Sequence, residues 1–175
     1  MNQLILNIIS KMSFSLFKSQ ISALTGRQHV SRIQFAETIA KAYNGLVTRA
    51  FETVTGGGKV VAPITGLPGL IAGIYSITEQ NLHQHNEVNF FSQIAPYFKM
   101  YWVGKQIIGP TGFVVINNTG QYKGPMIKQH FNFEIWVNIF VACCATHIMT
   151  LSGTYTTYAW GVTTPWSGAL LVSLP

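Results

Sequence analysis

The sequence has 175 residues, of which 48% are hydrophobic and only 9% are charged, against about 25% in an ordinary soluble domain. A chain of this length can bury a substantial core, but it must cover its surface with uncharged polar residues or hide it in contacts. The acidic residues are five Glu with no Asp, which excludes Ser-His-Asp triads, aspartyl dyads and Asp-held Mg²⁺ clusters. The low charge favours a protein that assembles with other chains or associates with a membrane.

The net charge is +6, and the basic residues are dispersed rather than clustered. Many of them lie in the first third, which would suit an anionic partner such as nucleic acid. No nucleic-acid motif accompanies them, so solvated helix faces are the simpler interpretation. These basic residues are Lys11, Lys18, Arg27, Arg32, Lys41, Arg49 and Lys59.

The first part of the chain predicts helices. Residues 1–29 form an amphipathic arm, with apolar residues near helical spacing. Val30–Val54 carries the clearest helical stripe, and Ser31 is a suitable N-cap. Three successive glycines from Gly56 end this helix, and we interpret them as a flexible linker.

The middle of the chain mixes uncharged and aromatic stretches. Val60–Thr78 lacks charge and is long enough to span a membrane, but prolines and glycines interrupt it, which favours a buried loop followed by a helix from Leu70. Pro96 is expected in the first turn of an aromatic-rich helix. Phe113–Ile116 reads as a short strand.

Two interpretations compete for Phe131–Leu151. Its first half alternates apolar and polar residues as a strand does, yet the run is much longer than a usual strand, and we favour a buried helix. Ile135–Pro175 contains no Lys, Arg, Asp or Glu. Such a segment must be covered by its own chain, by neighbouring chains or by lipid.

These patterns predict a mainly α fold, with α+β as the alternative. The expected organisation is an N-terminal arm over residues 1–29, a helical core domain over 30–152, and an extended, charge-free tail over 153–175. The glycine-rich linker falls within the core domain.

Candidate chemical motifs are weak. Gly56-Gly57-Gly58-Lys59 lacks the Ser or Thr and the strand-then-helix context of a phosphate loop. His83 and His85 have no third converging ligand for a metal. Cys144 and His147 lie at helical spacing, but their apolar surroundings disfavour a thiolate. We therefore expect no catalytic, cofactor-binding or metal-binding residues and no cofactor.

The charge-free tail supplies the candidate interface, because aromatic side chains dominate the energetics of protein contacts. Trp102 and Trp136 are expected in the core, whereas Trp160 and Trp166 lie among Thr, Gly and Pro. The predicted interface residues are Trp160, Trp166, Tyr155, Tyr158, Leu170 and Leu171.

Two stretches resemble small structural proteins of tailed bacteriophages. One is Phe35–Tyr43 followed by Thr55–Lys59, and the other is Tyr101–Gly104 followed by Pro110–Val114; together with the charge-poor composition they are similar to virion proteins. The resemblance implies a neck, tail or connector subunit located in the virion, and it carries no catalytic residues.

The expected function is therefore structural and non-enzymatic, with copies of the same chain and other virion proteins as partners. The first alternative is a small integral or peripheral membrane protein, with Val60–Thr78 and Ile135–Leu151 as spans. The second is an enzyme with a Cys/His or metal centre.

Overall fold

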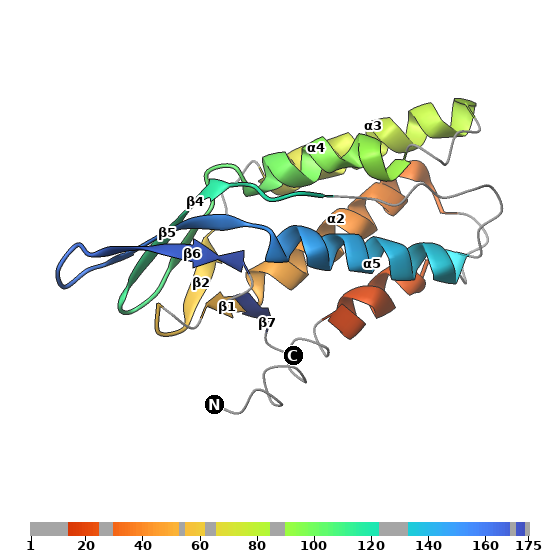
Figure 1. Ribbon diagram of the computed structural model, residues 1–175. Helices are drawn as coiled ribbons and strands as arrows, with labels where there is room; N and C mark the ends of the chain where they lie inside the picture. The colour runs from red at the N-terminus through yellow and green to blue at the C-terminus, as the bar shows by residue number, and fades with distance from the viewer. Residues whose placement is uncertain are drawn as a thin grey trace.

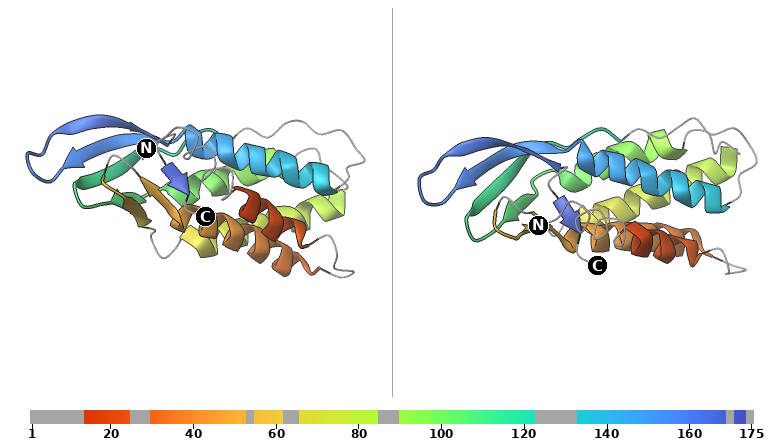
Figure 2. Two further views of the ribbon diagram at one scale, coloured as in Figure 1. Left: turned by 90° about the horizontal axis from the view of Figure 1, so that it is seen from below. Right: turned by 60° about the horizontal axis from the view of Figure 1, so that its bottom comes forward.

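The computed structural model describes residues 14–24, 30–52, 55–61, 66–84, 90–122, 133–168 and 171–173. These residues form a helix over residues 14–22, four longer helices and a seven-stranded antiparallel sheet (Figure 1). The mainly α prediction is therefore wrong and the α+β alternative is correct. The helices occupy one end of the molecule, and the hairpins of the sheet extend from the other (Figures 1 and 2).

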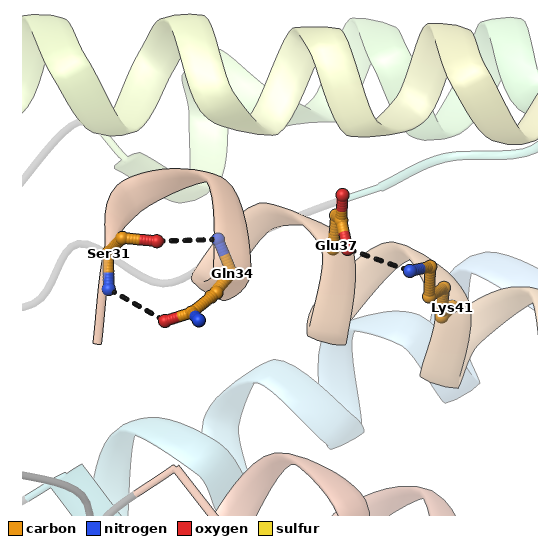
Figure 3. Close-up of polar contacts among 4 residues, drawn as sticks. All are labelled: Ser31, Gln34, Glu37 and Lys41. Atoms are coloured by element: carbon orange, nitrogen blue, oxygen red, sulfur yellow. Dashed lines mark hydrogen bonds and ion pairs between the residues drawn. The ribbon is translucent and has the colours of Figure 1, made fainter. Parts of the chain in front are cut away.

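Helix α2 (Arg32–Thr48) begins where the sequence predicts, at Ser31. The Ser31 hydroxyl accepts from the backbone N–H of Gln34 at 3.3 Å, and the Gln34 side chain accepts from the N–H of Ser31 at 3.1 Å (Figure 3). This reciprocal capping satisfies two donors that a helix start leaves without partners. One turn further on, Lys41 pairs with Glu37 at 2.7 Å on the exposed face, a contact that contributes a few tenths of a kcal/mol at most.

The helix ends earlier than the Val54 expected from its stripe. Residues Ala50–Glu52 form strand β1 instead, because their backbone pairs with two other strands. The sequence signal of helical periodicity here is overridden by tertiary pairing. The predicted helix over Val30–Val54 is thus correct for α2 and wrong beyond it.

Three further helices complete the helical end. They are α3 (Gly66–Gln84), α4 (Phe90–Trp102) and α5 (Phe133–Met149). Helix α5 confirms the helical interpretation of Phe131–Leu151, whereas Pro96 lies in the middle of α4 and not in its first turn. Gly73 lets the ring of Tyr97 lie directly on the α3 backbone, in the place that a Cβ atom would fill.

The sheet runs in the order β6-β5-β4-β3-β2-β1-β7. Besides β1, its strands are β2 (Gly58–Val61), β3 (Gln106–Ile108), β4 (Gly112–Asn118), β5 (Ser152–Thr157), β6 (Thr163–Ser167) and β7 (Leu171–Ser173). The first span of the membrane alternative, Val60–Thr78, is therefore divided between strand β2 and helix α3.

The sheet must be strongly curled. Strands β6 and β7 lie at its opposite edges, yet only residues 168–170 separate them in the chain. Seven strands in a flat sheet would place the edges roughly 28 Å apart, whereas the chain from Ser167 to Leu171 reaches about 14 Å at most. The C-terminal segment, expected as an extended tail, thus supplies three strands and both edges of this curled sheet.

The inner face of the sheet and the helices bury an aromatic core. Val60 and Ile107 alternate with exposed positions along their strands, and Val114 and Tyr155 are each more buried than their neighbours, so all four point inward. From the predicted N-terminal arm, Phe17 packs against Tyr43 and Phe140, with ring centres 6.3 and 5.9 Å apart; residues 1–13 of that arm lie outside the described ones. Trp102 is fully buried, as expected for a core residue, whereas Trp136 is half-buried and stacks on Phe140 at the edge of the core.

A hydrogen-bonded chain of three side chains crosses this core. Trp102 Nε1 donates to the Tyr43 hydroxyl at 2.8 Å, and that hydroxyl lies 3.4 Å from Nδ1 of His147. His147 Nε2 lies 2.7 Å from the carbonyl oxygen of Thr119. Because a carbonyl only accepts, Nε2 carries the proton and Nδ1 accepts from Tyr43. The chain joins α2, α4 and α5 to the segment after β4.

Tyr43→Phe tests the weight of this chain. Removing the hydroxyl leaves the buried Trp102 N–H without its acceptor, so we expect the free energy of unfolding to fall by about 1–3 kcal/mol. Tyr158→Phe, at an exposed position, is the matched control and should change stability by less than about 0.5 kcal/mol. Urea denaturation followed by circular dichroism measures both; equal effects in the two variants would contradict the role given to Tyr43.

Stability should also depend on pH through His147. Burial lowers the pKa of His147 to about 4, with Lys99 lowering it further and the Thr119 hydrogen bond opposing the shift. The unfolded chain has a histidine pKa of about 6.5, so it takes up a proton that the folded chain rejects between the two values. The contribution of His147 to the free energy of unfolding is then fully present above about pH 6.5. It is lost as the pH falls toward 4, by up to about 3 kcal/mol.

The comparison that isolates this effect is His147→Gln, whose amide keeps a donor for Thr119. Urea denaturation at pH 7 and at pH 4.5 should show a smaller loss in the variant than in the wild type. The carboxylates titrate in both proteins and cancel in the difference. If both proteins lose the same free energy of unfolding between pH 7 and pH 4.5, His147 is not the cause of the pH dependence.

Candidate functional site

Three turns meet at the end of the sheet that is remote from the helices. They are the described part of the β1–β2 connection at residues 55–57, the β3–β4 turn at 109–111, and the β5–β6 turn at 158–162 (Figure 1). The backbone N–H of Thr111 donates to the carbonyl of Thr55 at 3.1 Å, and the N–H of Tyr158 donates to the carbonyl of Thr111 at 3.1 Å. Thr111 therefore links all three turns, which we call the turn platform.

Side chains reinforce the same links. The Thr111 hydroxyl lies 2.9 Å from the hydroxyl of Tyr155 on strand β5. The buried Thr55 hydroxyl accepts from the backbone N–H of Gly58 at 2.8 Å. Neutral hydrogen bonds thus hold the platform, and residues 55–58, 109–112 and 157–163 contain no charged residue.

The glycines of the platform have a structural purpose that the linker interpretation missed. Gly56 and Gly57 adopt φ angles of +77° and +100°, which other residues rarely adopt. They form the tight connection into β2 rather than a flexible linker. Gly109 lies so close to Thr55 that a Cβ atom would be 2.5 Å from the Thr55 carbonyl oxygen, so only glycine lets the two turns touch.

The β5–β6 turn carries the most exposed aromatic side chain of the described residues. Its ends are closed by hydrogen bonds from Thr157 N to the Val162 carbonyl at 3.0 Å and from Gly161 N to the Thr157 carbonyl at 3.1 Å. Trp160 is 87% exposed at the tip and Tyr158 is 55% exposed. The Tyr158 ring also contacts Phe113, with centres 5.9 Å apart, so the turn is held while Trp160 projects into solvent.

The other predicted interface residues are placed differently. Trp166 and Tyr155 are 3% and 7% exposed and pack in the chain's own core, so in this fold they offer little surface to a partner. The backbone of Leu171 belongs to β7 and pairs with Glu52. Leu170 lies outside the described residues. Of the four predicted residues whose burial is described, Trp160 and Tyr158 are accessible.

An uncovered sheet face adjoins the platform. Val61, Ile108 and Val115 are exposed there, each pointing away from the core. Register places Val61 in a row with Gln106, Val115, Thr154 and Pro165, and Ile108 in a row with Lys59, Phe113, Thr156 and Thr163. Lys59 is the one charged side chain in these two rows. Sequence reasoning missed this face because β2 and β3, two of the strands that form it, have only four and three residues.

Cys144 and His147, the pair considered for nucleophilic catalysis, lie in the interior together with Cys143. Burial raises the pKa of Cys143 to about 11, and burial raises the pKa of Cys144 further, with the neighbouring Cys143 adding to it. A thiol of this kind holds little of the nucleophilic thiolate near neutral pH. Within the described ranges, no three His, Cys, Asp or Glu side chains gather as metal ligands would; His85 and His130 lie outside those ranges.

Gly109→Ala tests the contact between the turns. The added methyl would collide with Thr55 backbone and side chain, so we expect a loss of about 1–3 kcal/mol in the free energy of unfolding. Gly45→Ala is the matched control, because nothing lies within 4 Å of its Cβ position in helix α2, and it should stabilise the protein by about 0.5–1 kcal/mol. Thermal and urea denaturation measure the change in the free energy of unfolding for both variants. An unchanged value for Gly109→Ala would show that the turns do not need the close contact between Gly109 and Thr55.

None of the helices in the described ranges combines the length and the hydropathy that crossing a bilayer requires. Comparison with protein-family models, with curated protein sequences and with solved structures finds no match for this chain.

Proposed function

We propose that the chain is a non-enzymatic structural subunit that assembles with copies of itself through the turn platform. The observation that carries the proposal is Trp160, a large aromatic side chain left 87% exposed on a turn that hydrogen bonds hold in place. Tryptophan anchors dominate protein interfaces, and a turn whose backbone is already held by hydrogen bonds loses little conformational freedom on binding.

Energetics indicate that Trp160 does not act alone. Burying one tryptophan removes roughly 150–250 Å² from water, which is worth about 4–6 kcal/mol at 25 cal/mol per Å². Association costs about 4–15 kcal/mol in lost freedom of motion. The uncovered sheet face with Val61, Ile108 and Val115 adjoins the platform and supplies further apolar area.

The absence of charge on the platform suits this role. The chain carries a net charge of +6, and like charges brought together would oppose self-association. The platform avoids that repulsion because its three turns contain no charged residue. Several of its backbone groups, including the N–H groups of Thr111, Tyr158 and Gly161, already donate within the platform, so burying them against a neighbour does not leave them unpaired.

The virion placement of the subunit is proposed from a resemblance of its sequence to virion proteins. Phe35–Tyr43 with Thr55–Lys59, and Tyr101–Gly104 with Pro110–Val114, resemble structural proteins of tailed bacteriophages. We infer a place in the neck, tail or connector of a virion, where a cyclic head-to-tail contact between copies closes a ring. Other virion proteins are the further partners.

Trp160→Ser tests the assembly. Sedimentation velocity at micromolar concentration should show an oligomer for the wild type and a shift toward monomer for the variant, with the far-ultraviolet circular dichroism spectrum unchanged. Met100→Ser is the matched control, since Met100 is also exposed but lies on helix α4, and it should assemble like the wild type. A monomeric wild type, or normal assembly of Trp160→Ser, would contradict the proposal.

The virion placement has its own test. Affinity purification of the tagged wild type from phage-producing cells should recover portal, capsid or tail proteins, identified by mass spectrometry. The Trp160→Ser variant should recover fewer of them if the same platform makes these contacts. Recovery of no virion protein by the wild type would remove the virion placement, while leaving the self-assembly result to stand on its own measurement.

A further inference from the structure

Lys105 has an unusual position for a lysine. It follows helix α4 through Gly104, which has a φ of +73°, and leads into strand β3. The residue is 0% exposed, and within the described residues its Nζ has no hydrogen-bond partner. The face of the Tyr101 ring lies against it, with the ring centre 3.6 Å from Nζ. An ammonium group has three N–H donors, so leaving all three buried and unpaired is costly.

The Nζ atom faces the start of another helix. A Cβ atom built on Gly66, the first residue of α3, would lie 3.1 Å from Lys105 Nζ. The first turn of α3 has no acidic residue, and a helix start carries partial positive charge with N–H groups that lack acceptors within the helix. Two positive groups therefore face one another without a compensating negative charge from that turn.

Solvent reaches the same turn from outside. Pro68 and Gly69 are exposed, and nothing lies within 4 Å of the Cβ position of Gly69. Gly66 and Gly69 carry no side chain that would screen the backbone of this turn. Burial lowers the pKa of Lys105 to about 8, so near pH 7 the amine is still mostly protonated and attracts an anion.

We propose that Lys105 Nζ and the first turn of α3 form a binding site for a phosphate group. A tetrahedral oxyanion has enough oxygens to accept from the ammonium and from successive backbone N–H groups, the combination that proteins use at helix starts. Pro68 has no N–H, so the backbone donors come from its neighbours in the turn. The phosphate would be supplied either as the free ion or as the terminal group of a small molecule.

The site is independent of the turn platform, and it differs from a phosphate loop. Gly56-Gly57-Gly58-Lys59, the motif that suggested phosphate binding in the sequence, forms the connection into β2 and has an exposed lysine. The proposed site uses Lys105 and α3 instead, which no sequence motif brings together. Lys59 therefore serves as the natural control for Lys105.

The test uses the full chain and inorganic phosphate, with ionic strength held constant by sodium chloride. For the wild type and Lys59→Met, the melting temperature should rise and saturate as phosphate is added. For Lys105→Met, the phosphate affinity from calorimetry should fall about tenfold or more, the loss expected for a charged hydrogen-bonding partner. Lys105→Met should be at least as stable as the wild type without phosphate, because the unpaired ammonium is gone.

A second readout does not depend on the variant folding. The side-chain ammonium signal of Lys105 in ¹⁵N-lysine-labelled wild type should shift on phosphate addition, while that of Lys59 should not. Adenosine monophosphate, added in a parallel arm, separates the two sources: a Lys105-dependent response to it shows that a terminal phosphate group fits, and a response to inorganic phosphate alone assigns the free ion. A wild type whose melting temperature and Lys105 signal respond to neither anion would overturn the proposal, as would a Lys105→Met variant that binds like the wild type.

Discussion

The pairing of β1 with β7 is the constraint on which the arrangement of the rest depends. Glu52 lies opposite Leu171 and Ala50 opposite Ser173, while β6, which immediately precedes β7 in the chain, lies at the other edge of the sheet. Both pairings can hold together only in a curled sheet. The curl leads the chain past the end of α5, where Gly168 donates to the Leu151 carbonyl at 2.8 Å. It also aligns the three turns at one end and leaves one face of the sheet for the helices.

In this charge-poor chain, backbone hydrogen bonds and hydroxyl groups join elements that ion pairs could otherwise join. Thr111 holds three turns together without an ionised group, and Tyr43 joins Trp102 to His147 in the same neutral manner. Such contacts are insensitive to salt, unlike exposed ion pairs. The charge-free C-terminal segment buries Val137, Phe140 and Trp166 in its own chain. Its most exposed aromatic side chain in the described residues is Trp160 at the β5–β6 tip, while Ile135 and Met149 are exposed on α5.

The sequence predicted the helices better than the sheet, for physical reasons. Ser31 and the stripe that follows it mark α2, and the length of the apolar run identifies α5. In contrast, β1, β3 and β7 have three residues each, too few for an alternating pattern to be distinguished from helix or loop. Trp160 and Trp166 lie in similar Thr-, Gly- and Pro-rich surroundings, and only the strand register places one at a tip and the other inside. The burial of Lys105 cannot be predicted from its neighbours in the sequence, because the contact with Gly66 joins residues that are far apart in the chain.

The position of β7 also affects how the chain reaches its native state. On the ribosome β1 is made about 120 residues before β7, the strand that pairs with its outer side. Until β7 is made, one side of β1 keeps open backbone donors and acceptors. Contacts between residues so distant in the chain close slowly, since a long loop must be ordered before they form. The helices, whose contacts are local, can form in the meantime. An incomplete chain with an unpaired strand is prone to pair with other molecules, and in this fold β1 is the strand that stays open to such pairing until β7 is added.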